Sequence, residues 1–396
     1  MSSAPPSTEA RPHMVALAAT LVQAGAIRTT EWARVFGDVP RHVFVPRWFE
    51  QETNDKGIAV WREHHSTATP DDLAAVYRDL TLVIALDPDT AEQVDTDAWT
   101  GIPTSSSTLP SLMAGMLEDL DLTEGCRVLE IGTGTGYNAA LLSARLGEHL
   151  VYSVDIDPAL VLAAQERLST AGYTPQLVPG DGTLGYPTGE TFDRIIATCS
   201  VPAIPAAWIE QSKPGTVIVS DIALGIEGGI VRLEVDETGH AAGRFTATSG
   251  RFMAARTDAR TYPARQRPPL LPETTTRPTA VTAADIREHY PFRLLLAFHL
   301  PEAELVYHRD AAGALSLQIQ GPDGSWGRTP LAGDDTELVT CGGDPALWGQ
   351  VENAWRWWNT AGRPAHDRFA YARKTDGSAY VRYIPDGTRW NLPARG

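Results

Sequence analysis

The chain has 396 residues and a net charge of −16, and 43% of its residues are hydrophobic, which suits a globular protein of two or three domains. The excess of negative charge disfavours a nucleic-acid backbone as the main partner, and no apolar run is long enough to span a membrane. The cysteines at 126, 199 and 341 show no metal-ligand spacing and cannot form a full disulfide set. We therefore expect a reducing, cytoplasmic setting and no bound metal.

The N-terminal part of the chain has few strong signals. Residues 1–12 are small, polar and proline-containing, which predicts a disordered tail. Residues 13–100 are predicted to hold a helix over Met14–Ala26, a proline-framed extended segment over Val39–Pro46, and a polar, acidic insertion.

A run of hydroxyl side chains, Thr104–Thr108, precedes a predicted helix over Pro110–Leu120. Proline in the first turn, with hydroxyls before it, is typical of a helix N-terminus. We expect at least one of these hydroxyls to cap the helix.

The most informative segment is Glu130–Gly136, which predicts a buried strand from Arg127, a glycine-rich turn, and a helix starting near Tyr137. Glycines at 132 and 134 let the backbone approach a ligand closely. The dinucleotide fingerprint needs glycine where this chain has Tyr137, so NAD is disfavoured and S-adenosylmethionine is the alternative.

Two further segments complete a nucleotide-binding pattern. A second strand, Val151–Asp155, ends in a carboxylate about 20 residues after the first glycines, a spacing that suits binding of both ribose hydroxyls. Asp157 precedes Pro158 and can instead cap the following helix. Asp181 follows a third strand; it can accept a hydrogen bond from an adenine amino group, or belong to a plain polar turn.

A fourth strand is predicted from Phe192 and a fifth over residues 213–220. Strands that alternate with helical patterns indicate a parallel sheet, so residues 101–257 are predicted to form one α/β domain.

The remainder is predicted to be a proline-rich linker, 258–282, and an α+β domain, 283–396. Segments 304–309 and 315–320 are predicted to pair as strands, and Asp376-Gly377 to form the turn of a last hairpin. Pro345–Thr360 is predicted to be a helix whose face of Trp348, Val351, Trp355 and Trp358 belongs to the core.

Several of these segments, in this order, resemble the protein-L-isoaspartate O-methyltransferase family. The resemblance covers roughly residues 14–50 and 76–250. The matching segments are Val39–Pro46, Tyr77–Asp79, the hydroxyl run before Pro110, Leu129–Tyr137, Tyr152–Asp155, Gly180–Pro187 and Asp193–Thr198.

The resemblance implies a Rossmann-like S-adenosylmethionine-dependent methyltransferase sheet with helices on both faces. It implies that Ser106, Ser107 and Thr108 orient the acceptor carboxylate, with Tyr77 and Asp79 close to the peptide. It implies that the cofactor, which leaves as S-adenosylhomocysteine, is held by Glu130, Gly132, Thr133, Gly134, Tyr137, Asp155, Ile156, Gly180, Asp181, Gly182 and Thr198.

Two features depart from the repair enzymes of the family. Ser106–Pro110 stands where those enzymes carry Thr-Ile-Ser-Gln-Pro, and the chain continues past the catalytic domain. Both features resemble an actinobacterial subgroup associated with ribosomally made peptides (lanthipeptides, lasso peptides and graspetides), whose members methylate an aspartate that then closes to aspartimide or gives isoaspartate. We expect a monomeric enzyme acting on such a peptide; a general repair methyltransferase and an inactive cofactor-binding protein are the alternatives.

A carboxylate acceptor is already ionised at pH 7, so the predicted reaction needs no general base. Cys199 follows a strand without the Pro-Cys motif of cytosine methyltransferases, so covalent catalysis through its thiol is disfavoured.

Overall fold

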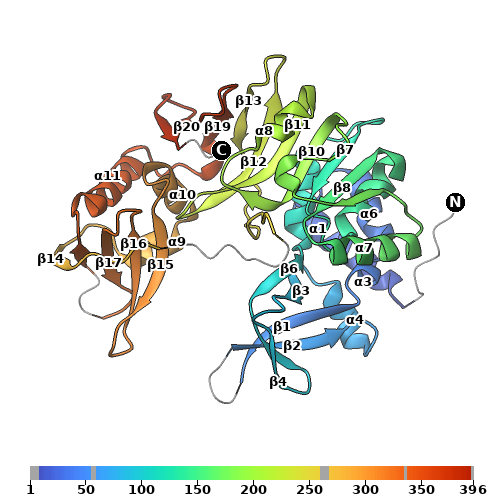
Figure 1. Ribbon diagram of the computed structural model, residues 1–396, viewed down its shortest axis with the longest axis horizontal. Coiled ribbons are helices and arrows are strands. Elements are labelled where there is room, and N and C mark those ends of the chain that lie inside the picture. Colours follow the sequence, from blue (N-terminus) through green and yellow to red (C-terminus); the bar gives the residue numbers. More distant parts are fainter. Residues whose placement is uncertain (1–8, 55–58, 259–266, 334–336, 394–396) are drawn as a thin grey trace.

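The fold is built on one ten-stranded main sheet, seen in a computed structural model that describes residues 9–54, 59–258, 267–333 and 337–393 (Figure 1). Its order is β21-β20-β19-β13-β12-β11-β10-β7-β8-β9. The half that ends in β9 is parallel, as the sequence predicts. It consists of β7 (Val128–Ile131), β8 (Val151–Asp155), β9 (Gln176–Pro179), β10 (Phe192–Val201) and β11 (Ser212–Ala223).

The other half of the main sheet is antiparallel and contains the end of the chain. It comprises β12 (Gly228–Val235), β13 (Ala241–Phe245), β19 (Phe369–Arg373), β20 (Ala379–Tyr383) and β21 (Arg389–Leu392). The hairpin through Asp376-Gly377 is present as predicted. It extends the main sheet rather than a separate domain, because β19 pairs with the otherwise open edge of β13.

Helices cover both faces of the main sheet, because neighbouring residues on its strands point into opposite cores. Val128 packs into one core and Leu129 into the other. The first core includes α1 (Arg11–Gln23), α2 (Thr30–Asp38), α5 (Pro110–Asp119), α6 (Tyr137–Leu146) and α7 (Pro158–Thr170), and the second includes α8 (Ala206–Glu210) and α10 (Tyr290–His299).

A second sheet forms an arm that projects from the half of the molecule that holds the parallel strands (Figure 1). We call residues 47–107 the arm. Its strand order is β4-β5-β2-β1-β3-β6, and α4 (Pro70–Val76) joins β2 to β3. The strands are β1 (Arg47–Thr53), β2 (Ala59–His65), β3 (Leu82–Leu86), β4 (Glu92–Asp95), β5 (Ala98–Thr100) and β6 (Pro103–Ser107).

The segment Val39–Pro46, predicted to be extended, contains one helical turn, α3 (Arg41–Phe44). The Val45 amide donates to the carbonyl of Arg41 over 3.1 Å and closes this turn. Because the side chains of Arg41 and Phe44 are both fully buried by it, packing outweighs the extended preference that the flanking prolines confer.

The third sheet, with order β14-β18-β17-β16-β15, and its helices form what we call the C-terminal unit, residues 273–360. The predicted pairing of 304–309 with 315–320 is confirmed as β15 and β16. The predicted tryptophan helix is confirmed as α11 (Ala346–Thr360), with Trp348 and Trp358 buried. The other elements are β14 (Glu273–Pro278), β17 (Trp326–Pro330), β18 (Leu338–Gly342) and α9 (Ala283–Glu288).

Two predicted segments fall partly outside the described residues. Most of the predicted tail, 1–12, precedes residue 9, although Arg11 already belongs to α1. The predicted linker, 258–282, includes the undescribed residues 259–266, and its later part forms β14. Among the residues that the structure describes, no helix is long and apolar enough to cross a membrane.

Candidate active site

A cavity of about 330 Å³ lies where the carboxyl ends of β7, β8 and β10 meet β6. Its position, beyond the carboxyl ends of parallel strands, and its size are typical of a ligand site in an α/β fold. Most of the residues predicted from the sequence line it: Ser106, Ser107, Thr108, Glu130, Gly132, Thr133, Gly134, Tyr137, Asp155, Ile156, Asp181, Gly182 and Thr198.

The turn after β7 needs glycine because its backbone is left-handed and because β10 packs closely against it. Gly132 and Gly134 have φ of +97° and +51°. A Cβ on Gly132 would lie 2.6 Å from the hydroxyl oxygen of Thr198, which donates to the Gly132 carbonyl over 2.7 Å. Gly132 is therefore required both by its backbone angle and by the approach of β10.

Glu130 is fully buried at the floor of the cavity. One carboxylate oxygen accepts from the amide of Asn138 over 2.8 Å, and the other accepts from the hydroxyl of Ser153 over 2.6 Å. Burial raises the pKa of Glu130 to about 7 against the effect of these hydrogen bonds. A bound cation would favour its ionised form.

Asp155 ends β8 with its carboxylate facing the glycine turn. It accepts from the Gly134 amide over 2.8 Å and from the Asp157 amide over 3.1 Å, and burial raises its pKa. Asp157 caps α7 by accepting from the Ala159 amide, and it does not line the cavity. The structure thus separates the two aspartates as the sequence pattern suggested, with Asp155 at the site.

Asp181 combines the two roles that the sequence left open. It caps a short 3-10 turn, Gly182–Leu184, by accepting from the Thr183 amide over 2.9 Å and from its hydroxyl over 2.7 Å. It also lines the cavity. Gly180, predicted to contact the cofactor, is not among the lining residues; its amide instead donates to the carbonyl of Asp155.

The opposite wall is the hydroxyl strand, by which we mean β6 together with Thr108. Residues 104–108 all line the cavity, with Ser107 buried and Ser106 and Thr108 half-buried. The expectation that one of these hydroxyls caps α5 is wrong. The N-cap residue is Leu109, which has no side chain for the purpose.

Tyr77 and Asp79, predicted to lie near the peptide, are not among the lining residues. Asp79 accepts from the Ser111 amide over 2.8 Å and thereby caps α5 from outside the helix. The Tyr77 hydroxyl lies 2.6 Å from Nδ1 of His42, and its ring is buried. Asp79 thus fixes the start of the helix that follows the hydroxyl strand, whereas Tyr77 contacts His42.

A buried arginine that was not predicted from the sequence holds the hydroxyl strand in place through hydrogen bonds. Arg41 is fully buried, and burial lowers the pKa of its guanidinium to about 10. It donates to Val76 O, Arg78 O, Leu80 O, Thr108 O and Ser107 Oγ over 2.9 to 3.3 Å. All five of these hydrogen-bond partners are neutral, and the charge of Asp79 favours the ionised guanidinium, so Arg41 ties the hydroxyl strand to residues 76–80.

The second missed feature is the wall segment, Arg251–Arg256, whose six residues all line the cavity. It adds a short parallel bridge to β10: the Ser200 amide donates to the Met253 carbonyl, and the Ala255 amide donates to the Ser200 carbonyl. Arg256 reaches across to the carbonyl of Thr104 over 3.4 Å. The wall segment and the hydroxyl strand thus meet on one side of the cavity.

Two buried polar atoms of lining residues lack a hydrogen-bond partner among the described residues. They are the hydroxyl of Tyr137 and the side-chain oxygen of Asn138. Buried polar atoms are normally paired, so these atoms fit a site built for a polar ligand. The Cys199 thiol also lines the cavity, but burial raises its pKa to about 12, which disfavours the thiolate that covalent catalysis would need.

Comparison with known proteins agrees with this geometry. The sequence model of the protein-L-isoaspartate(D-aspartate) O-methyltransferase family matches residues 58–243. The protein-L-isoaspartate O-methyltransferase of Methanosarcina mazei is 39% identical over 133 residues, which are 33% of this chain and 54% of that protein. The protein of the same name from Xanthobacter autotrophicus is 48% identical over 111 residues, 28% of this chain and 50% of that protein. The chain thus spans about half the length of these curated relatives.

A solved structure titled protein-L-isoaspartate O-methyltransferase has a TM-score of 0.51 and 22% identity, covering 92% of this chain and 98% of the other. This similarity shows the fold, an α/β sheet covered by helices. Its coverage extends beyond residue 257, so the similarity reaches the C-terminal region. The family match and the two relatives show that residues 58–243 are similar in sequence to the protein-L-isoaspartate(D-aspartate) O-methyltransferase family.

Proposed function

We propose that this chain is an S-adenosylmethionine-dependent O-methyltransferase that acts on a side-chain carboxylate of an aspartyl or isoaspartyl residue in a peptide or protein. The observation that carries the proposal is one cavity that joins two sets of groups. The glycine turn, Glu130, Asp155 and Asp181 form one side, and the hydroxyl strand forms the other.

The first set suits S-adenosylmethionine. The buried carboxylate of Glu130 matches a cationic methionine portion, and Asp155 keeps free lone pairs for ribose hydroxyls beside its two backbone donors. The Asp181 oxygen that does not accept from Thr183 is available to an adenine amino group. The cofactor supplies a methyl group on a positively charged sulfur.

The second set suits a carboxylate acceptor. Ser106 and Thr108 line the cavity, and neither hydroxyl makes a side-chain hydrogen bond within the part of the chain that the structure describes, so both can donate to an incoming carboxylate. The acceptor is ionised at pH 7, so the residues need only hold its oxygen in line with the methyl group. Because an anion and a cation react to give neutral products, exclusion of water from the cavity assists the transfer.

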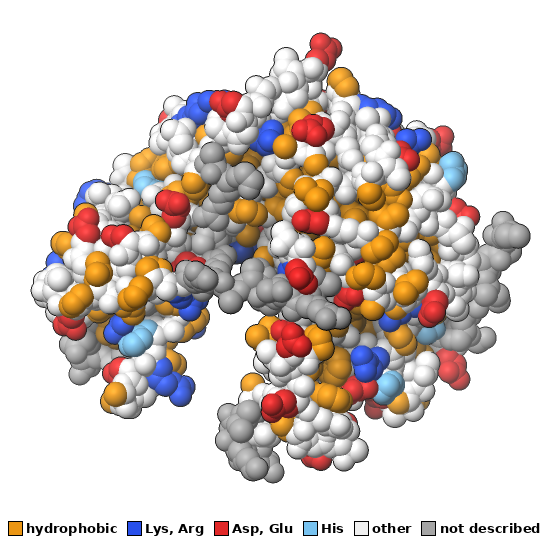
Figure 2. Space-filling model, viewed as in Figure 1, with side chains coloured by type: hydrophobic (Ala, Val, Ile, Leu, Met, Phe, Trp, Pro, Cys, Tyr) orange, Lys and Arg blue, Asp and Glu red, His pale blue; other side chains and the backbone are white. Residues whose placement is uncertain are grey.

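Within this class we propose that the acceptor is an aspartate of a constrained, ribosomally made peptide. The ester would then close to aspartimide when the next backbone nitrogen attacks and methanol leaves. The altered segment Ser106–Pro110 supports this choice, since its first three residues line the cavity on the side proposed for the acceptor. The arm and the C-terminal unit also stand apart, with a recess between them that leaves room for a bulky substrate (Figure 2).

General repair of isoaspartyl damage is the second candidate, and one observation favours it. The solved structure titled protein-L-isoaspartate O-methyltransferase matches this chain beyond residue 257. The C-terminal extension therefore does not by itself separate the chain from proteins of that name.

Mass spectrometry with S-adenosylmethionine and two acceptors separates the candidates. One acceptor is a linear isoaspartyl peptide, and the other is a macrocyclic aspartyl peptide encoded beside the gene. Gain of one methyl group followed by loss of methanol on the macrocycle alone supports peptide tailoring. Turnover of the linear peptide alone supports repair. Binding of the cofactor without turnover of either would leave an inactive binding protein.

A further inference from the structure

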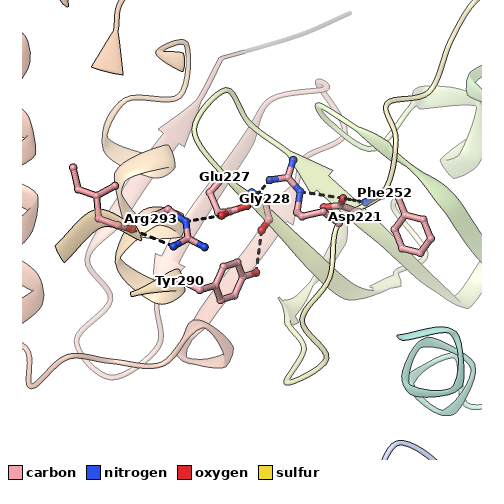
Figure 3. Close-up of polar contacts among 8 residues, drawn as sticks. Asp221, Glu227, Gly228, Phe252, Tyr290 and Arg293 are labelled. Carbon is pink, nitrogen blue, oxygen red and sulfur yellow. Dashed lines mark hydrogen bonds and ion pairs between the residues drawn. The ribbon is translucent and has the colours of Figure 1, made fainter. Parts of the chain in front are cut away.

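The wall segment of the cavity is fixed at its start by two carboxylates from the β11–β12 hairpin (Figure 3). Asp221, fully buried near the end of β11, accepts from the Phe252 amide over 2.9 Å and lies 3.4 Å from Nε of Arg251. The guanidinium of Arg251 also forms an ion pair with Glu227, in the turn of the hairpin. The backbone and side chain at the start of the wall segment are thus both held by this hairpin.

The C-terminal unit contacts the same hairpin from its other side through an ion pair and hydrogen bonds (Figure 3). The second carboxylate oxygen of Glu227 accepts from Nε of Arg293, on α10, over 2.8 Å. Arg293 in turn donates to the carbonyl of Ile286 over 3.1 Å. The Tyr290 hydroxyl donates to the carbonyl of Gly228 over 2.9 Å. Glu227 is therefore shared by one arginine at the cavity and one in the C-terminal unit.

The backbone of the hairpin packs closely against the C-terminal unit around this contact. A Cβ on Gly225 would lie 2.0 Å from the carbonyl oxygen of Ala303, and a Cβ on Gly229 would lie 2.7 Å from the Tyr290 hydroxyl. Backbone that approaches so closely moves together with its neighbour. A displacement of α10 would therefore be passed to the hairpin and from there to the wall segment.

We infer that Arg293, Glu227 and Asp221 are positioning residues through which the C-terminal unit sets the wall segment against the peptide acceptor. This inference rests on the proposed function for the identity of the acceptor. Two guanidinium groups and two carboxylates balance in this cluster. Removing the charge of Glu227 leaves Arg293, whose side chain is 19% exposed, without this ion pair, whereas Arg251 keeps its ion pair with Asp221.

The acceptor, rather than the cofactor, is the ligand that this cluster affects. The wall segment meets the hydroxyl strand through Arg256 and Thr104. The hydrogen bonds that hold Glu130 and Asp155, the groups proposed for the cofactor, come from Asn138, Ser153 and Gly134, outside the wall segment. Arg256, at the end of the wall segment away from the cluster, favours the ionised form of Asp155 through its charge. Disturbing the cluster should therefore change acceptor affinity and spare cofactor affinity.

The test uses the full-length chain with Glu227→Gln, which removes one charge and keeps the side-chain shape. We expect the KM for the methyl-accepting peptide to rise on the order of tenfold, the scale of one lost charged hydrogen bond, with a smaller change in kcat. The dissociation constant for S-adenosylmethionine should stay within about twofold. Hydrogen exchange of the amides in residues 251–256 should become faster.

Two further variants make the result specific. Glu352→Gln removes an ion pair of similar geometry, to Arg277 at 2.8 Å, inside the C-terminal unit and away from the cavity, and it should behave as wild type. Arg293→Lys keeps the charge but not the planar fork, and it should fall between wild type and Glu227→Gln. It also serves as the working variant if Glu227→Gln does not fold.

Unchanged KM and unchanged exchange in residues 251–256 for both Glu227→Gln and Arg293→Lys would overturn the inference, as would an equal effect from Glu352→Gln. Failure of the proposed function looks different. In that case the wild-type chain methylates no carboxyl peptide, while the exchange experiment still reports whether the C-terminal unit positions the wall segment.

Discussion

At the scale of single residues, Asp155 and Asp157 show how two nearby carboxylates acquire different roles. Asp155 lines the cavity, whereas Asp157 caps α7. Asp155→Ala should weaken S-adenosylmethionine binding by about 1–3 kcal/mol through lost hydrogen bonds, as measured by calorimetric titration. Asp157→Ala is the matched control: it should cost about 1 kcal/mol of folding stability as a lost cap and leave cofactor affinity unchanged. Equal affinities for wild type and Asp155→Ala would remove Asp155 from the site.

The stability of the folded chain should depend on pH through Glu130, because burial raises the pKa of this residue from the usual 4.5 to about 7. Its folded-state pKa lies above the unfolded value, so its contribution to stability is fully present below about pH 4.5 and is lost as pH rises through about 7. Glu130→Gln does not titrate. In urea unfolding without cofactor, the stability of the variant relative to wild type should therefore increase between these pH values and level off above them.

Asp221, whose pKa is also raised, occurs in both proteins of that comparison and cancels in the difference. Asp155 occurs in both as well, but its charge contributes to the raised pKa of Glu130, so this coupling is part of the measured difference. A difference in unfolding free energy that stays flat across the range would show that Glu130 titrates normally in the folded chain.

At the scale of elements, α5 depends on a cap supplied by a distant segment. Because Asp79 accepts from the Ser111 amide, Asp79→Ala should lower the unfolding free energy by about 0.5–2 kcal/mol. Asp79→Asn keeps an oxygen acceptor and should lose less. Since Asp79 does not line the cavity, cofactor affinity should be the same in all three proteins. A large loss of cofactor affinity in Asp79→Ala, with stability intact, would return Asp79 to the binding site.

Elements with a complete local signal were predictable from sequence. The strand Val151–Asp155 is a short apolar run ending in a turn signal, and α11 has a buried tryptophan face at helical spacing. The arm strands gave no such signal because most of their residues are exposed or half-buried, and all four residues of β4 are exposed.

The site residues that lie close together in the sequence, within one motif, could be predicted. Those that come together only when distant segments pack could not. The glycine turn and Asp155 follow directly from the first two strands of the parallel sheet. The wall segment is placed by its bridge to Ser200, and Arg41 by contacts to residues 76–80 and 107–108. No local pattern reports such long-range contacts.

At the scale of the whole molecule, one hydrophobic core runs from the main sheet into the C-terminal unit. The last three strands belong to it, with Phe369, Tyr371 and Val381 fully buried. Each such side chain contributes about 1.5–3 kcal/mol, so their joint loss approaches the whole stability of a typical domain, about 5–15 kcal/mol. The strands after residue 368 are therefore a structural part of the main sheet.

A chain ending at Arg368 should consequently fail to keep a stable main sheet. Its β13 would become an open edge next to uncovered apolar side chains such as Phe298, which packs against Phe369 with ring centroids 5.4 Å apart. An open edge beside an apolar surface promotes association, so light scattering should show aggregates and circular dichroism a lower melting temperature. A chain ending at Pro393 keeps β19–β21 and serves as the control. If the shorter chain were monomeric with an unchanged melting temperature, the C-terminal strands would be an attachment to the methyltransferase sheet rather than part of its core.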